Sequence, residues 1–314
     1  MRAVRSTPPG VTVVDVDEPD GPGELIAIRS ASICASDFGY IQWGSQFLLG
    51  HELAGVTEDG RAVAIEAIFG CDACDLCAAG QYNLCASTGT TALGIMADGG
   101  MSEWFRAPAR SLVTLPDGLD PTDASLVEPA SVAWHTCHLA GVGPDQRVAV
   151  VGGGAIGLLA VAAARAMGAG EVSLAARYPH QIELGERLGA TAPSGAYDVV
   201  IEAAGSESSL HQCTELARPG GTMGVLGVFP PDVVWPQTQC FIKELRTVPA
   251  LGYCNHGHGH GRDFDEAAAM LAADPDLVDA LITHRFPIDD AAEAFRVASD
   301  KSTGALRVVL DPVS

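Results

Sequence analysis

The chain has 314 residues, about twice the length of a typical single domain, so one or two domains are expected. Its 47% hydrophobic and 18% charged residues supply enough apolar material for a core, which excludes a largely disordered chain. The net charge of -21, from 18 basic and 39 acidic residues, argues against a nucleic acid or an anionic membrane surface as the main partner.

The first 125 residues alternate short apolar runs with glycine, proline and aspartate, the pattern of a mostly antiparallel, barrel-like β region. Strands are predicted at 23–30, 62–67 and 111–116, and no long amphipathic helix is expected between them. The opening residues contain no apolar run of signal-peptide length, so we expect a cytoplasmic protein.

From residue 126, strands alternate with helices, as in the βαβ units of a doubly wound parallel sheet, the α/β Rossmann arrangement. The apolar run at 148–164 approaches the length of a membrane span, but its four glycines fit a strand, a turn and a helix better. The predicted strands are 148–151, 171–175, 197–202 and 222–227, and the predicted helices are 156–167, 180–188 and 208–217. Farther on, two helical stretches surround 282–287, and a strand covers 306–310.

A glycine-rich turn follows the first strand of this region. Residues 152–157 fit G-x-G-x-x-G between a strand and a helix, which is the setting that a dinucleotide pyrophosphate requires. Gly152 allows the tight turn, Gly154 lets the backbone approach the pyrophosphate, and Gly157 permits close packing of helix on strand. With Ala155 and Ile156 at the helix N-terminus, they form the predicted cofactor loop. The alternative is a glycine-rich turn without a ligand.

The end of the next strand indicates which dinucleotide binds. NAD-binding proteins place an acid there for the ribose hydroxyl, whereas NADP-binding proteins place an arginine nearby for the 2'-phosphate. Here no acid is present and Arg177 follows the strand, with Tyr178 beside it. A guanidinium can bind a phosphate through two hydrogen bonds, so NADP(H) is predicted over NAD(H). The alternative is an ordinary solvated arginine.

Nine cysteines in a chain without an export signal favour metal binding over a disulfide framework. Four of them have the spacing C-x2-C-x2-C-x7-C, and four thiolates so placed can complete a closed tetrahedral zinc site, which is structural rather than catalytic. These are Cys71, Cys74, Cys77 and Cys85. An iron–sulfur cluster and free thiols are the alternatives, but no proline follows Cys85 as it does in ferredoxin-type runs.

A second set of metal-ligand residue types is dispersed along the chain. Cys34, His51 and the carboxylates Glu52 and Glu128 together offer the sulfur, nitrogen and oxygen ligands of a catalytic zinc. Taken singly, each residue fits an ordinary buried thiol, core histidine or solvated acid equally well. Their order relative to the four cysteines and the nucleotide-binding region favours the metal interpretation.

Taken together, these motifs resemble the zinc-dependent medium-chain alcohol dehydrogenases, nearest the sorbitol and threonine dehydrogenase branch. Further stretches at 198–205 and 282–295 are similar to family segments, so the resemblance covers nearly the whole chain. The motifs that carry it are Cys-Ala-Ser-Asp at 34–37, Gly-His-Glu-Leu-Ala-Gly at 50–55, Asp-Gly-Gly-Met-Ser-Glu-Trp at 98–104 and Glu-Pro-Ala-Ser at 128–131.

The resemblance implies a GroES-like catalytic domain at 1–125, rejoined by 256–314, and a Rossmann NADP-binding domain at 126–255, with two zinc ions per chain. Cys34 and His51 would bind the catalytic zinc, while Glu52 would bind it or lie beside it. Glu128 would be the fourth ligand or hold a zinc-bound water. Asp37 would orient His51. Ser36 would pass the substrate proton outward. The substrate would be a small alcohol or polyol, or its carbonyl, and a homo-oligomer is expected.

The sequence departs from the family pattern at two places. The stretches at 38–49 and 56–61 are shorter than usual, which predicts a more open or differently walled substrate pocket. Some relatives carry a relay histidine shortly after the Cys-x-Ser-Asp motif, where this chain has Phe-Gly-Tyr at 38–40. Proton exit through water or through the ribose hydroxyls is then the simpler expectation.

Other functions stay open at this point. One is a zinc-free reductase of carbon–carbon double bonds on the same fold, and another is a catalytically silent NADP-binding protein that keeps a structural zinc. The His-Gly run at 256–260 is interpreted as an exposed flexible loop rather than a metal-binding tract. Four cysteines lack ligand spacing and are predicted to be ordinary buried thiols: Cys137, Cys213, Cys240 and Cys254.

Overall fold

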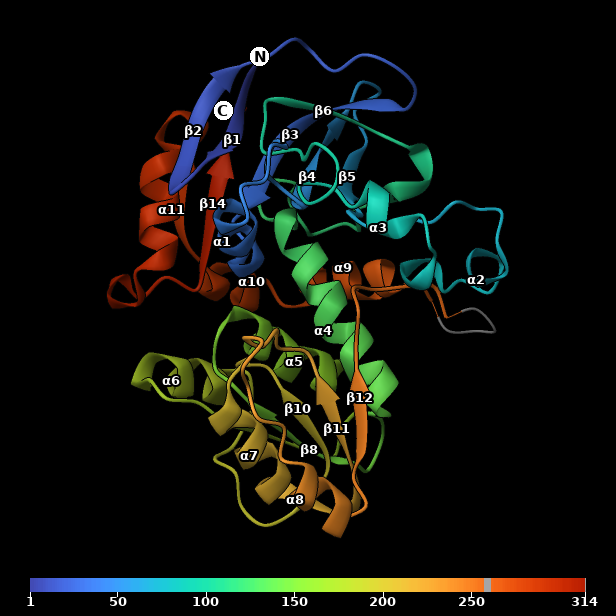
Figure 1. Ribbon diagram of the computed structural model, residues 1–314, viewed down its shortest axis with the longest axis vertical. Coiled ribbons are helices and arrows are strands. Elements are labelled where there is room, and N and C mark those ends of the chain that lie inside the picture. Colours follow the sequence, from blue (N-terminus) through green and yellow to red (C-terminus); the bar gives the residue numbers. More distant parts are fainter. Residues whose placement is uncertain (257–260, 314) are drawn as a thin grey trace. The chain divides into compact units, whose positions relative to one another are not determined.

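The computed structural model describes residues 1–256 and 261–313 (Figure 1). The chain divides into two compact units. The first comprises Met1–Glu128 together with Cys254–Ser314, and the second comprises Pro129–Tyr253. The boundaries predicted from the sequence, 125/126 and 255/256, lie a few residues away in each case. Helix α4 (Val127–Ala140) carries the chain from the first unit into the second.

The first unit contains a seven-stranded sheet and a separate two-stranded hairpin. The sheet has the order β13-β14-β3-β4-β5-β7, and β6 also pairs with β3. All pairs are antiparallel except β13 with β14, so the predicted mostly antiparallel β region is confirmed. The hairpin consists of β1 (Arg2–Thr7) and β2 (Gly10–Asp15). The sheet strands are β3 (Glu24–Ser32), β4 (Glu52–Thr57), β5 (Ala62–Ile65), β6 (Trp104–Ala107), β7 (Leu112–Thr114), β13 (Ile282–Pro287) and β14 (Arg307–Asp311).

The core of this unit is apolar and involves both the sheet and its helices. Ile26 and Ile28 of β3 are fully buried, and Phe295 packs edge-on against Phe38 with ring centroids 5.7 Å apart. The helices of this unit are α1 (Ala35–Gln42), α2 (Asp75–Ala78), α3 (Thr88–Thr91), α9 (Asp263–Ala273), α10 (Pro275–Leu281) and α11 (Ala291–Ser299). Short 3-10 helices cover Tyr82–Leu84, Ala109–Ser111, Ala124–Leu126, Ile288–Asp290 and Lys301–Thr303. Packing of α11 on β2 and pairing of β14 with β3 therefore tie the last part of the chain to the first.

The second unit is built on a five-stranded parallel sheet in the order β12-β11-β10-β8-β9. From β8 the chain moves first to β9 on one side and then to β10 on the other, so the strand order reverses at the carboxyl end of β8. Ligands of doubly wound sheets bind at such a reversal, and the glycine-rich turn lies there. The elements are β8 (Arg147–Val151), α5 (Ala155–Ala166), β9 (Glu171–Ala175), α6 (Pro179–Arg187), β10 (Tyr197–Glu202), α7 (Glu207–Leu216), β11 (Ala217–Val225), α8 (Gln237–Ile242) and β12 (Arg246–Pro249).

The predicted strands and helices of this unit are all present, and the Rossmann arrangement is confirmed. Three elements were not predicted from the sequence: helices α4 and α8, and β12, a short edge strand that pairs with β11 alone. Three of its four residues are exposed, so its sequence carries little of the apolar pattern that marks the inner strands. Within the part of the chain that the structure describes, no helix combines the length and apolar character needed to cross a membrane.

Candidate active site and metal centres

The antiparallel pairing of β3 with β4 brings two predicted zinc ligands together. Cys34 lies just after β3, at the start of α1, and His51 lies just before β4. Because Ser32 pairs with Glu52, the residues that follow β3 and those that precede β4 meet at one end of the strand pair. The ligand atoms of Cys34, His51 and Glu52 all lie within 4.8 Å of one another.

Ser36 lies between the thiol and the imidazole. Its Oγ donates to Cys34 Sγ at 3.2 Å and lies 3.3 Å from His51 Nε2. Tyr40, in the Phe-Gly-Tyr stretch at 38–40, packs edge-on near His51 with ring centroids 6.2 Å apart. Burial raises the pKa of the Tyr40 phenol, and a hydrogen bond with Ser36 opposes that change. A hydroxyl therefore reaches both candidate ligand atoms from the first turn of α1.

Asp37 connects the backbone of Cys34 to the imidazole of His51. Its Oδ2 accepts the backbone N–H of Cys34 at 3.0 Å, and its Oδ1 lies 3.4 Å from His51 Nδ1. Within the described part of the chain, neither Oδ1 nor Nδ1 forms a hydrogen bond, although both atoms are buried. Since Nδ1 faces the carboxylate, Nε2 is the nitrogen left to face Ser36 and Cys34.

Glu52 is held on its other side by an arginine that the sequence analysis did not select. Arg307 Nη1 donates to both carboxylate oxygens of Glu52 at 2.8 Å, and Ser32 Oγ donates to Oε2. Arg307 also donates to the carbonyl of Ile33 at 3.2 Å. Both charged side chains are almost fully buried, with 8% of Arg307 and 1% of Glu52 exposed. A lone arginine at the start of β14 gives no motif by which sequence reasoning would find it.

Glu128 lies in the same electrostatic environment but outside the tightest group. It is buried in the first turn of α4, and its carboxylate is not one of the ligand atoms within 4.8 Å. Burial, reinforced by the charge of Glu52, raises the pKa of Glu128 to about 8. Burial raises the pKa of Asp37 to about 6. Burial alone would lower the pKa of His51, but Asp37, Glu128 and Glu52 together raise it.

The four cysteines with the regular spacing converge in a lobe around α2. The ligand atoms of Cys71, Cys74, Cys77 and Cys85 all lie within 4.8 Å of one another. Cys74 Sγ lies 3.6 Å from Cys77 Sγ and 3.7 Å from Cys85 Sγ. Sulfurs about 2.3 Å from a tetrahedral zinc lie about 3.8 Å apart, so the lobe has the dimensions of a closed zinc site. Backbone N–H groups of Ser87 and Cys71 lower the pKa of the Cys85 thiol to about 6, which favours the thiolate that binds metal.

The glycine-rich loop has the geometry that its sequence predicts. Gly152 adopts a φ of +120°, which favours glycine. A Cβ on Gly157 would lie 1.8 Å from the Gly152 carbonyl oxygen, so only a glycine lets α5 pack this closely. A Cβ on Gly154, by contrast, meets no atom within 4 Å. The backbone at Gly154 is thus open to a ligand at the N-terminus of α5, where Ala155 and Ile156 follow.

Arg177 and Tyr178 are exposed between β9 and α6. Tyr178 stacks on His180 with ring centroids 5.8 Å apart. Among the residues that the structure describes, no ion pair or hydrogen bond engages the Arg177 guanidinium. A cation placed directly after the second strand is therefore available to an external anion.

The chain matches two family models that together span most of its length. A model of the glucose dehydrogenase C-terminus matches residues 122–310, and a model of the alcohol dehydrogenase GroES-like domain matches residues 21–117. The chain belongs to the zinc-type medium-chain alcohol dehydrogenase family. Membership of this family confirms the resemblance on which the sequence analysis relied.

This dehydrogenase is similar to curated proteins along nearly their whole length. D-xylulose reductase A of Aspergillus oryzae is 32% identical over 316 residues, which cover 88% of this chain and 86% of the relative. L-galactonate-5-dehydrogenase of Escherichia coli is 29% identical over 310 residues, covering 87% and 88%.

Solved structures show the same relationship. A zinc-binding dehydrogenase of Sinorhizobium meliloti bound to NADP superposes with a TM-score of 0.85 at 29% identity, covering 99% of both chains. Galactitol-1-phosphate dehydrogenase of Escherichia coli superposes with a TM-score of 0.88 at 25% identity, covering 99% of this chain and 100% of the other.

One interpretation from the sequence is wrong. His256 is not part of an exposed loop without ligand-type neighbours, because its side chain is only 12% exposed and lies beside Cys254 and Asp263. No local motif marks this group, because Asp263 begins α9, seven positions farther along the chain. Residues 257–260 of the same run lie outside the described part of the chain. Cys137, Cys213 and Cys254 are buried as predicted, whereas Cys240 is half-buried.

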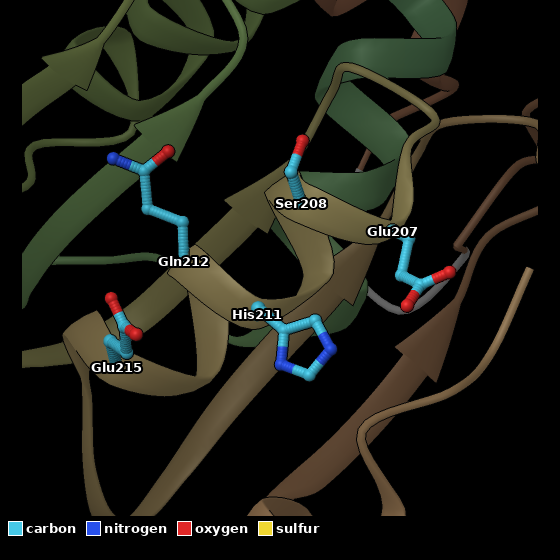
Figure 2. Close-up of a pocket in the computed structure, with 5 residues that line it drawn as sticks. All are labelled: Glu207, Ser208, His211, Gln212 and Glu215. Carbon is cyan, nitrogen blue, oxygen red and sulfur yellow. The ribbon is translucent and has the colours of Figure 1, made fainter.

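A shallow surface pocket on the second unit lacks the converging side chains of the sites described above. Figure 2 shows its lining side chains, which all come from α7 and point in different directions. They are Glu207, Ser208, His211, Gln212 and Glu215. Because they lie on one helix and do not converge, the pocket suggests no binding site in this dehydrogenase.

Proposed function

We propose that this dehydrogenase transfers a hydride between NADP(H) and a small polyol or its carbonyl, with a catalytic zinc bound by Cys34 and His51. The observation that carries the proposal is the group of Cys34, His51 and Glu52 ligand atoms within 4.8 Å, with the Ser36 hydroxyl beside the first two. Relatives named as acting on a xylulose, a galactonate and a galactitol phosphate support a polyol as the substrate class.

The residues present fit a zinc ion. Thiolate and imidazole are preferred zinc ligands, and a carboxylate from Glu52 or Glu128 would supply the oxygen ligand. The 3.4 Å approach of Asp37 Oδ1 to the otherwise unpartnered His51 Nδ1 is the arrangement that orients a metal-binding imidazole. Zinc bound at this site supplies a Lewis acid that lowers the pKa of an alcohol and polarises a carbonyl.

Ser36 is the residue placed to handle the substrate proton. Its Oγ, within 3.3 Å of both candidate ligand atoms, would accept the hydroxyl proton of the alcohol and release it outward to water. The alcohol then loses one proton to solvent and one hydride to the nicotinamide, which balances its conversion into a carbonyl. Arg307 holds Glu52 in place throughout, and Asp37 fixes the orientation of His51.

The glycine loop and Arg177 would bind NADP(H). Gly152, Gly154 and Gly157, with Ala155 and Ile156, would hold the pyrophosphate at the N-terminus of α5. Arg177 would bind the 2'-phosphate, with Tyr178 beside the adenosine. The neighbour solved with NADP supports this choice of cofactor. Bound NADP(H) supplies or accepts the hydride.

A second zinc would be structural, bound in the lobe by Cys71, Cys74, Cys77 and Cys85, so the proposal includes two zinc ions per chain for this function. A cytoplasmic location, a homo-oligomeric assembly and the domain roles assigned to 1–125, 126–255 and 256–314 stay predictions from the sequence.

Activity and zinc content measured together test the catalytic site. Zinc-equilibrated protein is incubated with NADP⁺ and a panel of pentitols, hexitols and aldonates, and NADPH formation is followed by absorbance. Cys34→Ser is expected to lose turnover and one zinc per chain while keeping its secondary structure, and Cys240→Ser, a half-buried cysteine outside the site, to retain both. Turnover retained in Cys34→Ser would contradict the assignment.

Cofactor choice is tested separately by direct binding. Arg177→Ala is expected to weaken NADPH binding at least about tenfold, equivalent to about 1.4 kcal/mol, and to leave NADH binding nearly unchanged. Arg187→Ala, an exposed arginine at the end of α6, is the control. An equal loss for NADPH and NADH would remove the 2'-phosphate role of Arg177.

A further inference from the structure

The start of the C-terminal segment contains a sulfur, nitrogen and oxygen group that the proposed catalysis does not use. Cys254 and Asp263 are 3% and 0% exposed, and the His256 side chain is 12% exposed. Their ligand atoms belong to a group in which all atoms lie within 4.8 Å of one another. All three residues lie in the first unit, and none belongs to the four-cysteine lobe or to the Cys34 group.

The backbone fixes the positions of these side chains. Asp263 Oδ2 accepts the backbone N–H of Cys254 at 2.7 Å, and the backbone N–H of Asp263 donates to the Cys254 carbonyl at 3.0 Å. The second carboxylate oxygen, Oδ1, lies 2.8 Å from His256 Nε2. One carboxylate therefore holds the Cys254 backbone and reaches the imidazole, so the group is positioned before any ligand arrives.

The spacing of the thiol and the imidazole matches metal coordination. Cys254 Sγ lies 3.6 Å from His256 Nδ1 and 3.8 Å from Nε2. A sulfur about 2.3 Å and a nitrogen about 2.1 Å from a tetrahedral zinc lie about 3.6 Å apart. The thiol and the imidazole are therefore already spaced to hold one ion between them, as the cysteines of the lobe are.

We propose that Cys254, His256 and Asp263 form a third metal site, for a divalent cation of the zinc class. Thiolate and imidazole select borderline-soft metals such as zinc over magnesium and calcium, which bind mainly to oxygen. The metal would add a third ion to the two on which the proposed function relies, and it does not depend on that function.

The neighbouring contacts give the site a structural role. Between Cys254 and His256, the backbone N–H of Asn255 donates to the Gly80 carbonyl of the four-cysteine lobe at 2.9 Å. Next to Asp263, Arg262 Nε donates to the buried Glu66 at 2.7 Å, and the Tyr82 hydroxyl donates to the same carboxylate oxygen at 2.5 Å. An ion bound here would fasten the C-terminal segment to the lobe, because Asn255 and Arg262, which make these contacts, lie next to the proposed ligands.

Zinc content of the full-length protein tests the proposal. Wild type and variants are equilibrated with Zn²⁺, freed of unbound metal by desalting, and analysed for zinc per chain by mass spectrometry. His256→Ala is expected to contain one zinc fewer than wild type, and Cys254→Ser to lose the same zinc. The matched controls Cys240→Ser and His284→Ala, both half-buried and outside any ligand group, are expected to keep the wild-type count.

A second readout identifies the ligand atoms. With Co²⁺ in place of Zn²⁺, the intensity of the thiolate-to-cobalt absorption is expected to decrease in Cys254→Ser by the contribution of one thiolate ligand. In Cys240→Ser the intensity is expected to be unchanged. Equal zinc counts in wild type and His256→Ala would overturn the proposal and leave a metal-free histidine–aspartate pair. Because His256 lies at the surface of the group, this variant decides the question even where Cys254→Ser does not fold.

This test is independent of the catalytic proposal. Cys34→Ser removes the catalytic zinc in that proposal and leaves the third site intact, so the two losses are counted separately. A zinc lost in His256→Ala but not in Cys34→Ser would support the third site and contradict the catalytic one. The reverse result would contradict only the third site.

Discussion

Replacing Arg307 tests whether a buried charge pair supports the candidate active site. In Arg307→Met, the carboxylate of Glu52 loses both 2.8 Å contacts with Nη1 while only 1% of the Glu52 side chain reaches solvent. Removing one partner of a buried ion pair leaves an uncompensated charge, which costs about 3–5 kcal/mol. Ser32 still donates to Glu52 and recovers part of this energy, so we expect the lower end, about 3 kcal/mol, in the free energy of unfolding.

The assay is equilibrium urea unfolding of the zinc-equilibrated protein, with hydrogen exchange of the β3, β4 and β14 amides as a local measure of the same free energy. Arg285→Met is the matched control. Arg285 lies on the adjacent strand β13 and pairs with Asp123 and Asp311, but about a third of its side chain is exposed. A partly exposed pair contributes about 0–1 kcal/mol.

A double variant separates the pair from the packing around it. Arg307→Met combined with Glu52→Gln removes both charges, so it should be less destabilised than the sum of the single variants by about 2 kcal/mol or more. The reasoning is refuted if Arg307→Met costs no more than Arg285→Met, or if the two single effects simply add. Either result would mean that water or a rearranged Ser32 satisfies Glu52.

Three further predictions follow from local geometry. Gly157→Ala places a Cβ 1.8 Å from the Gly152 carbonyl oxygen and should lower the free energy of unfolding by about 2 kcal/mol or more. Gly154→Ala meets nothing within 4 Å, so it should cost less, about 1 kcal/mol for the poorer N-cap of α5, and weaken NADPH binding about tenfold. Thermal unfolding and fluorescence titration measure the two effects, and equal stability losses would contradict the assignment. Gly70→Ala directs a Cβ at Cys77 Sγ, 2.3 Å away, and should reduce zinc occupancy of the lobe, measured as zinc per chain; a wild-type zinc count would argue against it. The backbone N–H of Arg147 and the side chain of Arg218 lower the pKa of Asp198, which should therefore contribute about 1 kcal/mol above its ordinary pKa of 3.8 and lose it as the pH falls through the lowered value. Asp198→Asn should destabilise the protein more at neutral pH than at pH 3, in urea unfolding at both pH values.

The local motifs predicted much of the second unit and the identity of the candidate ligands. The glycine loop could be placed from sequence because its turn, its helix start and its packing all depend on neighbouring residues. The pattern of β8 and α5 is likewise local, since their buried positions are runs of apolar residues. That Cys34 and His51 belong to one site could be predicted only through the family motifs. The register of β3 on β4 brings them together, and their spacing along the chain does not indicate that register.

Contacts between distant parts of the chain could not be predicted. Arg307 is 255 positions from Glu52, and Arg262 is 196 positions from Glu66. Both arginines are ordinary members of a set of 18 basic residues. Only the folded structure shows with which carboxylate each forms an ion pair. His256 was misinterpreted for the same reason over a shorter range: its partner Asp263 begins the next helix.

The position of β14 in the sheet has a consequence for how the protein is made. β14 lies between β13 and β3, inside the first unit, yet it is synthesised after the whole of the second unit. The second unit is continuous in sequence and can fold once Tyr253 has emerged from the ribosome, whereas β3 must wait for a neighbour more than 270 positions away. During that interval the unpaired edge of β3 can pair with other chains and aggregate. A ribosome that stalls once residue 253 has left its exit tunnel should therefore yield a nascent chain with a folded second unit and an unfinished seven-stranded sheet.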